Sequence, residues 1–438
     1  MGGGCGSTST QPPGDDGGVG SSNGGSGGSS GVSHAALPQV DDNGGGIVTA
    51  PEIVTITFEP SLYANAISPD ATTMIADLLD FDDTLTQSTY WDTVRAGYCE
   101  PLNSRNCVGK GTTVDPTTDH VSIATAPDAT YTDAPDYGPS TLRPYISALF
   151  AANTLPPPNG NRVYVFYFPK STTITVSGGV TCSDIGGYHN DLLVGAVDVP
   201  YAIVPVCDPE MTEQATPELT VEQMATFSAS HEIIESVTDP HESEPPTGSN
   251  SAANLGFYMT NAASQAWPIV LGGGEVADLC LDILGLGEDR STAGKYTTQR
   301  VWNNLSAAAN HDPCVPIPSG EVYFNVAPPV ADQEFQIAVG GTNSFNAVAF
   351  SDGTMDAWTV QLVDVGQNAT NTQSTVLTTA PTKASTNNGD SVACSITLNS
   401  TPPDQPDQVS GPGVEPYALV SVNAAGEYHL WPGLVAAQ

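Results

Sequence analysis

The chain has 438 residues, of which 39% are hydrophobic, so it can bury a core in more than one domain. Ten lysine and arginine residues stand against 48 aspartate and glutamate residues, which gives a formal net charge of -38. Such a chain repels phosphates, so nucleic acid and anionic membranes are not expected as partners. A large net charge of one sign also keeps protein molecules soluble and apart, so we expect a monomer. No stretch approaches the ~20 apolar residues of a membrane-spanning helix, so no transmembrane segment is predicted.

Residues 1–45 are dominated by Gly, Ser, Asp and Pro, a composition that buries too little apolar surface to offset its chain entropy. We therefore expect a disordered tether. Within it, Cys5 follows small residues and precedes a Gly/Ser-rich stretch, which resembles the start of a mature bacterial lipoprotein. This resemblance implies an extracellular or cell-surface protein anchored at Cys5, and the alternative is that Cys5 is incidental.

The other cysteines favour export, because their spacing suggests local disulfides. The pairs expected from proximity in the sequence are Cys99 with Cys107, Cys182 with Cys207, and Cys280 with Cys314. Cys394 is then left over. No C-x-x-C pair occurs in the chain, so a zinc site made of cysteines is not expected.

Residues 46–318 mix strand and helix patterns. Strands are predicted over 53–58 and 163–168, the second an almost continuous apolar run typical of a buried strand. A helix is predicted over 141–152 from its apolar spacing. These patterns predict an α/β or α+β domain.

A further helix is the best signalled element of the chain. Thr220 with Gln223 forms a capping-box pattern at its start, and Pro240 disfavours helix in the preceding residue. The helix should therefore end before Pro240.

Residues 319–438 change to short alternating segments separated by turn residues, which predicts an all-β sandwich. We expect this accessory domain to bind a cell-surface polymer or to act as a spacer. The expected strands lie near 322–326, 335–339, 347–350, 358–363, 392–398, 417–422 and 428–431.

The chemistry is expected on the well-signalled helix, which carries His231-Glu232-Ile233-Ile234-Glu235. Positions i and i+4 share one helix face, so His231 and Glu235 can reach a single ion. This is the geometry of the zincin H-E-x-x-H motif with a carboxylate in place of the second imidazole, and zinc accepts both ligand types. Glu232 would then be the general base that takes a proton from water. The expected fold is a zincin-like α/β (α+β) N-terminal domain followed by the β-sandwich.

A third protein ligand is required, and spacing leaves two alternatives open. His241 stands where the third histidine falls in H-E-x-x-H-x-x-G-x-x-H, although Thr238 occupies the glycine position of that motif. The other candidates are Glu275 and Asp278, in a loop that a disulfide at Cys280 would hold.

The helix motif extends to Thr238-Asp239-Pro240, and Gly274-Glu275-Val276-Ala277-Asp278-Leu279-Cys280 follows later. Together these segments resemble bacterial secreted proteins that are distantly similar to the plant phosphate-induced, EXORDIUM-like family. The resemblance covers roughly residues 46 to 318. It implies that Asp278 or Glu275, rather than His241, completes the site.

The leading hypothesis is a secreted zinc-dependent metallopeptidase-like hydrolase that acts on peptide or protein substrates. The rival is a non-catalytic extracellular EXORDIUM-like binding or signalling protein with a structural metal site. Calcium is the rival ion, because Asp239, Glu275 and Asp278 offer hard oxygen ligands. Each residue of the motif taken singly also fits a solvated helix charge or an ordinary hydrogen-bonded histidine.

Overall fold

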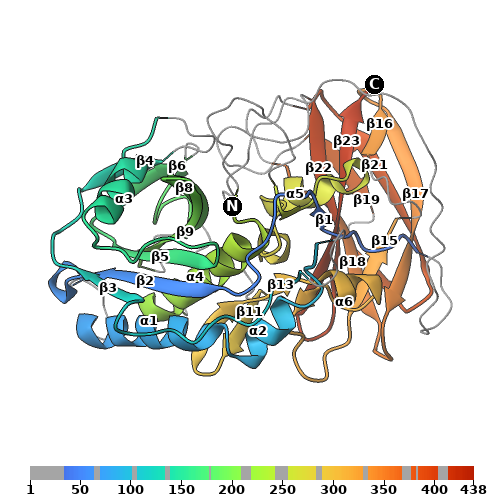
Figure 1. Ribbon diagram of the computed structural model, residues 1–438. Coiled ribbons are helices and arrows are strands. Elements are labelled where there is room, and N and C mark those ends of the chain that lie inside the picture. Colours follow the sequence, from blue (N-terminus) through green and yellow to red (C-terminus); the bar gives the residue numbers. More distant parts are fainter. Residues whose placement is uncertain are drawn as a thin grey trace.

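The computed structural model places two groups of elements side by side, one built around a mixed sheet and one built from two antiparallel-rich sheets (Figure 1). The residues it describes are 34–63, 70–100, 106–133, 139–176, 179–208, 219–241, 255–282, 289–328, 334–366, 376–380, 383–402 and 413–438.

The central sheet of the first group has the strand order β3-β2-β5-β9-β8. Its strands are β3 (His120–Ile123), β2 (Glu52–Phe58), β5 (Arg162–Pro169), β9 (Val197–Val206) and β8 (Tyr188–Val194). The first four run parallel, and β8 is an antiparallel edge strand. Strand β5 is buried from Val163 onward, because both faces of the sheet are covered.

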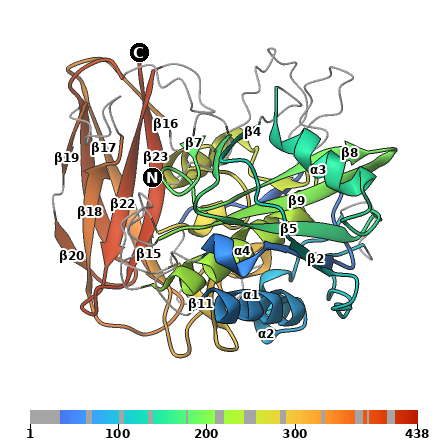
Figure 2. The same ribbon diagram turned by 90° about the vertical axis from the view of Figure 1, so that its left-hand side faces the viewer.

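Helices cover both faces of this sheet. In the views of Figures 1 and 2, α1 (Ala71–Leu85) and α4 (Val221–Thr238) lie below the sheet and α3 (Leu142–Ala151) lies above it. Helix α1 packs against α4, and α2 (Thr89–Val94) follows α1 after a short turn. The helices expected over 141–152 and up to Pro240 are confirmed within a residue or two.

Several small sheets surround the central one. They pair β1 (Asp41–Asp42) with β10 (Phe257–Tyr258), β11 (Arg290–Ala293) with β12 (Tyr296–Gln299), β13 (Val301–Trp302) with β14 (Cys314–Val315), and β6 (Thr173–Val176) with both β4 (Thr130–Asp133) and β7 (Gly179–Val180). Two short helices complete this part, α5 (Ala266–Leu271) and α6 (Asn304–Ala308).

The C-terminal strands form two sheets, as the alternating pattern predicts, so the β-sandwich prediction is confirmed. One sheet has the order β15 (Phe324–Ala327), β17 (Thr342–Ser351), β21 (Ser391–Leu398), β19 (Leu377–Ala380). The other has the order β16 (Glu334–Ile337), β23 (Tyr428–Ala437), β22 (Val414–Val422), β18 (Trp358–Asp364), β20 (Ala384–Thr386). In β18 buried and half-buried residues alternate strictly.

The expectation of a zincin-like α/β (α+β) N-terminal domain is wrong as a fold class. The described chain is mostly β, with 38% strand and 21% helix, and its strands form seven sheets. Many of these strands have only two to four residues, too few for a period of two to be visible in the sequence. The long helix α4 is strongly signalled by contrast, so the sequence showed the helices and missed many of the short strands.

The expected tether also ends earlier than residue 45. The structure describes the chain from His34, and Ala35, Leu37 and Val40 are buried in the core. These apolar side chains, together with the pairing of β1 with β10, order a segment whose composition suggested a linker. Cys5, the proposed anchor, lies outside the described residues.

The disulfide predictions are confirmed. Cys99–Cys107, Cys182–Cys207 and Cys280–Cys314 are bonded, and Cys394 is a buried free thiol. Disulfides persist in oxidising compartments, which agrees with an exported protein. Among the helices that the structure describes, none is long and apolar enough to cross a membrane.

A cluster of aromatic rings joins the two groups of elements. Trp267 of α5 makes edge contacts with Trp302 of β13 and with Trp431 of β23. Beside it the Tyr428 hydroxyl donates a hydrogen bond to Asp282. The sandwich therefore packs directly on the segments that follow α4, and one apolar core runs through both parts.

Helix α1 carries a buried carboxyl group that ties it to the central sheet. Asp82 is fully buried and accepts hydrogen bonds from Thr55 Oγ1 of β2 at 2.7 Å and the Tyr167 hydroxyl of β5 at 2.9 Å. Burial raises its pKa to about 7, although the two hydrogen bonds act in the opposite direction. The folded protein therefore favours the protonated form of Asp82.

This raised pKa makes stability depend on pH. The pKa of Asp82 is higher in the folded than in the unfolded chain. Its contribution to the free energy of unfolding is therefore complete below about pH 4 and is lost as the pH rises through 7. Asp82→Asn should remove this part of the pH dependence, so its unfolding free energy relative to wild type should rise by roughly 2 to 4 kcal/mol between pH 4 and pH 8. Urea denaturation across that range measures it. Asp128→Asn, at an exposed position, is the matched control, and parallel pH profiles for Asp82→Asn and wild type would contradict this account.

Candidate metal centre

Helix α4 carries the candidate site on its last turns. Its start has the expected capping box, in which Thr220 and Gln223 each accept a hydrogen bond from the other's backbone N–H. The helix is buried on nearly all sides, between strands β9, β8 and β5, helix α1 and strand β12. Side chains near its C-terminal end therefore point into protein rather than into solvent, which holds them in fixed positions.

His231 lies on the side of α4 that faces β12. Its Nε2 is 2.9 Å from Glu235 Oε2 and 3.5 Å from Asp278 Oδ1, and its Nδ1 is 2.8 Å from Gln299 Oε1. The Gln299 amide is itself oriented, because its Nε2 donates to the Ala277 carbonyl at 2.7 Å. The amide oxygen must then accept from Nδ1–H, which leaves Nε2 as the nitrogen available to an ion.

Glu235, one helical turn after His231, is almost completely buried. Its Oε1 accepts hydrogen bonds from the backbone N–H groups of Ala277 and Asp278, at 3.0 and 3.2 Å. Its Oε2 faces His231 Nε2, and it also lies 3.8 Å from Nδ1 of His189. One carboxyl group thus joins the helix to the loop that carries Asp278.

Asp278 begins a short 3-10 turn, Asp278–Cys280, that the Cys280–Cys314 disulfide fixes. The preceding glycines allow the loop to fold back on itself. A Cβ on Gly273 would lie only 1.6 Å from Asp278 Oδ2, so only glycine leaves room for the carboxylate. The expected acidic loop therefore reaches the helix motif.

Glu232 is buried beside this group, on the flank of the helix. Gly187, just before β8, leaves room for it, because a Cβ there would lie 2.7 Å from Glu232 Oε1. Burial raises the pKa of Glu232, while the nearby His231 and His189 act in the opposite direction. A carboxylate with a raised pKa is better suited to take up a proton near neutral pH.

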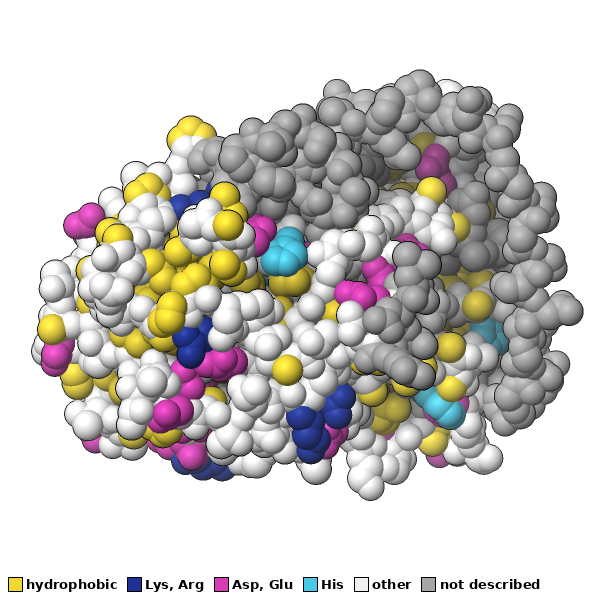
Figure 3. All heavy atoms as spheres, viewed as in Figure 1, with side chains coloured by type: hydrophobic (Ala, Val, Ile, Leu, Met, Phe, Trp, Pro, Cys, Tyr) yellow, Lys and Arg dark blue, Asp and Glu magenta, His cyan; other side chains and the backbone are white. Residues whose placement is uncertain are grey.

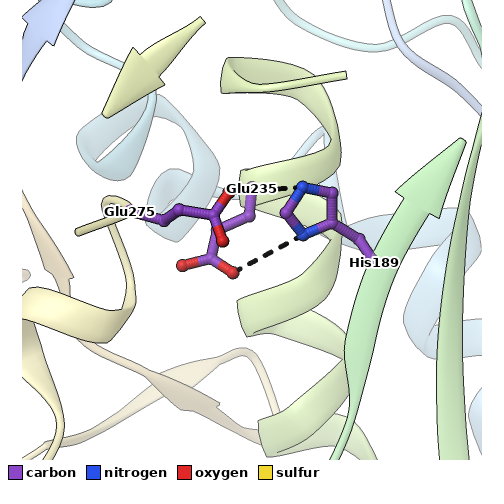
Figure 4. A group of neighbouring side chains, drawn as sticks. All are labelled: His189, Glu235 and Glu275. Atoms are coloured by element: carbon purple, nitrogen blue, oxygen red, sulfur yellow. Dashed lines mark ion pairs between the residues drawn. The ribbon is translucent and has the colours of Figure 1, made fainter. Parts of the chain in front are cut away.

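No sequence motif points to His189, which the structure places at the centre of the site. His189 lies on edge strand β8, and its imidazole faces the carboxyl groups of Glu235 and Glu275, one at each ring nitrogen (Figure 4). Its Nε2 is 3.3 Å from Glu275 Oε1, and its Nδ1 is 3.9 Å from Glu232 Oε2. No spacing motif links a residue of β8 to α4, so only the folded chain reveals this contact. Gln299 was missed for the same reason.

His241, the alternative third ligand by spacing, belongs to a different group. Its Nδ1 lies 3.3 Å from Asp198 Oδ2, and with Asp191 these residues form a separate cluster near the β8–β9 hairpin. The helix ends at Thr238, and the turn after it directs His241 away from the group at His231. The structure thus brings His231, Glu235 and Asp278 together and leaves His241 outside.

The charges of the group are strongly coupled. Burial would lower the pKa of His231, but the carboxylates of Glu235 and Glu232 and the hydrogen bond to Asp278 raise it well above its usual value. Burial and the charge of Glu235 raise the pKa of Asp278. Burial would raise the pKa of Glu235, but His231 holds it below its usual value. Positive charge is therefore strongly favoured at this point.

The donor set fits a zinc ion. His231, Glu235 and Asp278 each offer one donor atom, and the three atoms lie within 4.8 Å of one another. Zinc with bonds of about 2.0 to 2.2 Å separates tetrahedral ligand atoms by about 3.3 Å, close to the distances found here. The second ring nitrogen of His231 is hydrogen-bonded to Gln299, as is usual for histidine ligands. Calcium fits less well, because it prefers six to eight oxygen ligands.

The comparisons with known proteins leave the function open. No protein family model matches the chain, and no curated protein is similar to it. The solved structures that partly superpose on this chain include β-domain proteins with low sequence identity and low TM-scores. The periplasmic chaperone SfaE has 9% identity and a TM-score of 0.20, covering 27% of this chain and 56% of its own. The PapD-like domain 7 of human CEP192 has 12% identity and a TM-score of 0.19, covering 29% of this chain and 90% of its own. This chain thus spans little more than half of SfaE.

Replacing Gly273 tests the tight approach of Asp278. Gly273→Ala should force the Asp278 carboxylate to move and should lower the unfolding free energy by about 1 to 3 kcal/mol, the usual cost of overpacking. Gly160→Ala is the control, because a Cβ there meets nothing within 4 Å and should change stability by less than about 0.5 kcal/mol. Urea denaturation gives both values. Equal stability of the two variants would show that Asp278 does not occupy this position.

Proposed function

We propose that this protein is a zinc-dependent hydrolase that acts on peptide bonds. The observation that carries the proposal is the convergence of His231 Nε2, Glu235 Oε2 and Asp278 Oδ1, with the buried carboxyl group of Glu232 beside them. Three protein ligands, with the fourth position left to water, are typical of catalytic zinc sites, whereas structural sites use four protein ligands. The imidazole favours zinc over calcium, which supports catalysis over a purely structural ion.

Each residue has a role in this proposal. Zinc held by His231, Glu235 and Asp278 would supply a Lewis acid that polarises the scissile carbonyl and acidifies water. Glu232 takes the proton from the attacking water and passes it to the leaving amine. Gln299 fixes the ring of His231, and the backbone N–H groups of Ala277 and Asp278 fix Glu235.

The setting supports a substrate outside the reducing cytosol. Three disulfides stabilise the described chain, and one of them anchors, at Cys280, the loop that carries Asp278. Acidic side chains are scattered over the face drawn in Figure 3, where lysine and arginine are few, so polyanionic substrates are disfavoured. We propose a cell-surface or secreted hydrolase whose sandwich binds a surface polymer or holds the catalytic part at a distance from it.

The test separates metal binding from catalysis. Protein purified without chelator should contain zinc, and His231→Ala should lose the ion bound at its position. Glu232→Gln should keep its zinc but hydrolyse casein or a peptide library at least about 100-fold more slowly, because it lacks the base. Metal content by mass spectrometry and peptide turnover measure these outcomes.

His311→Ala is the matched control, because His311 also pairs with a carboxylate, Asp352, but its side chain is 52% exposed and lies elsewhere. It should leave zinc content and turnover unchanged. Wild-type protein without zinc, or with calcium that His231→Ala retains, would exclude the hydrolase and leave the non-catalytic binding protein. Zinc that is present without any peptide turnover would indicate a structural site.

A further inference from the structure

The carboxyl group of Glu235 belongs to two clusters of donor atoms. One is His231, Glu235 and Asp278, and the other is His189, Glu235 and Glu275 (Figure 4). We propose that the second cluster binds a second divalent cation, next to the first, with Glu235 shared between the two ions. This inference rests on the proposed function, because it extends the same centre.

The geometry at His189 resembles that at His231. The backbone carbonyl of Asp239 and Glu275 Oε1 lie 3.1 and 3.3 Å from His189 Nε2, which holds the ring in place. Its Nδ1 faces Glu235 Oε2 at 3.8 Å and Glu232 Oε2 at 3.9 Å. One donor atom from each of His189, Glu235 and Glu275 lies within 4.8 Å of the others, separations that a metal ion with bonds of about 2.1 Å can largely span. Both histidines thus have one nitrogen held by an oxygen and the other directed at the same carboxyl oxygen.

Glu235 is suited to be shared. Its Oε1 is held by two backbone N–H groups, which leaves Oε2 directed at both His231 and His189. Hydrolases with two metal ions place them ≈ 3.5–4 Å apart, often around shared ligands. A carboxyl oxygen positioned between two imidazoles fits that arrangement.

The buried charge also exceeds what one ion balances. Five carboxyl groups of this region are nearly inaccessible to solvent, namely Glu232, Glu235, Asp239, Glu275 and Asp278. Two imidazoles, those of His189 and His231, serve four of these carboxyl groups, namely Glu232, Glu235, Glu275 and Asp278. Buried carboxylates are costly unless they are paired or bind metal. One divalent cation offsets two negative charges, so a second cation would offset two more where these groups are ionised.

A second ion would widen the chemistry of the site. Two neighbouring cations can hold both oxygens of a tetrahedral transition state, or one can hold the substrate while the other assists the attack of water. Glu275 and His189 would then act as metal ligands in the hydrolysis, although neither stands on the helix motif.

The test counts ions with single-site variants. Chelator-stripped protein dialysed against a slight excess of zinc should take up about two ions, whereas His189→Ala and His231→Ala should each take up about one. Glu235→Ala should lose most of both, and His311→Ala should match wild type. If wild type holds one ion that His231→Ala loses and His189→Ala keeps, the second site is absent and the proposed function stands. If the single ion depends on His189 alone, the hydrolase site as proposed fails instead.

Crystals of the wild-type protein soaked in zinc give a measurement that does not depend on variant folding. Diffraction at the zinc edge should show two anomalous peaks, one beside His231 and Asp278 and one beside His189 and Glu275, about 3.5 to 4 Å apart. A single peak, or a second peak at His241 and Asp198, would overturn the inference.

Discussion

The structure of this centre depends on how the Glu235 carboxyl group is held. Two backbone N–H groups of the Asp278 loop bind one oxygen, and the other oxygen faces the imidazoles of His231 and His189. Charge-assisted hydrogen bonds of this kind are stronger than neutral ones, and in a buried place they fix geometry. Through this one group, helix α4, strand β8 and the loop before Cys280 are brought to a common point.

The helix part of the site could be predicted from the sequence because its information is local. The capping box, Pro240 and the four-residue spacing of His231 and Glu235 fix where the helix begins and ends and which side chains share a face. Asp278 was within reach as a candidate because it stands near Cys280, whose disulfide was predictable. His189 and Gln299 were not predictable, because only the pairing of distant strands brings them to α4. His241 is the opposite case: its spacing from His231 matches a metal-binding motif, but the chain turns after Thr238 and His241 pairs with Asp198 instead.

The fold divides in the same way. The longer sandwich strands, such as β18 and β21, are long enough for alternation to be visible, so the all-β C-terminal part was predicted. In the other part many strands have only two to four residues and pair over long distances, as β1 does with β10, so the sequence predicted fewer strands than the structure contains. Core packing also ordered Leu37 and Val40, whose surroundings in sequence are those of a linker. Whether such a segment is ordered depends on its tertiary contacts, which its composition does not reveal.

The central claim is that zinc binds here through imidazole nitrogen and carboxylate oxygen. Zinc K-edge X-ray absorption of the metal-loaded protein tests it most directly, because it reports the atoms bound to the ion. The account predicts a first shell of nitrogen and oxygen at about 2.0 to 2.1 Å, with the outer-shell scattering typical of imidazole. A sulfur shell at about 2.3 Å, or an oxygen-only shell without imidazole, would contradict it, because neither arises from His231 with its neighbouring carboxylates.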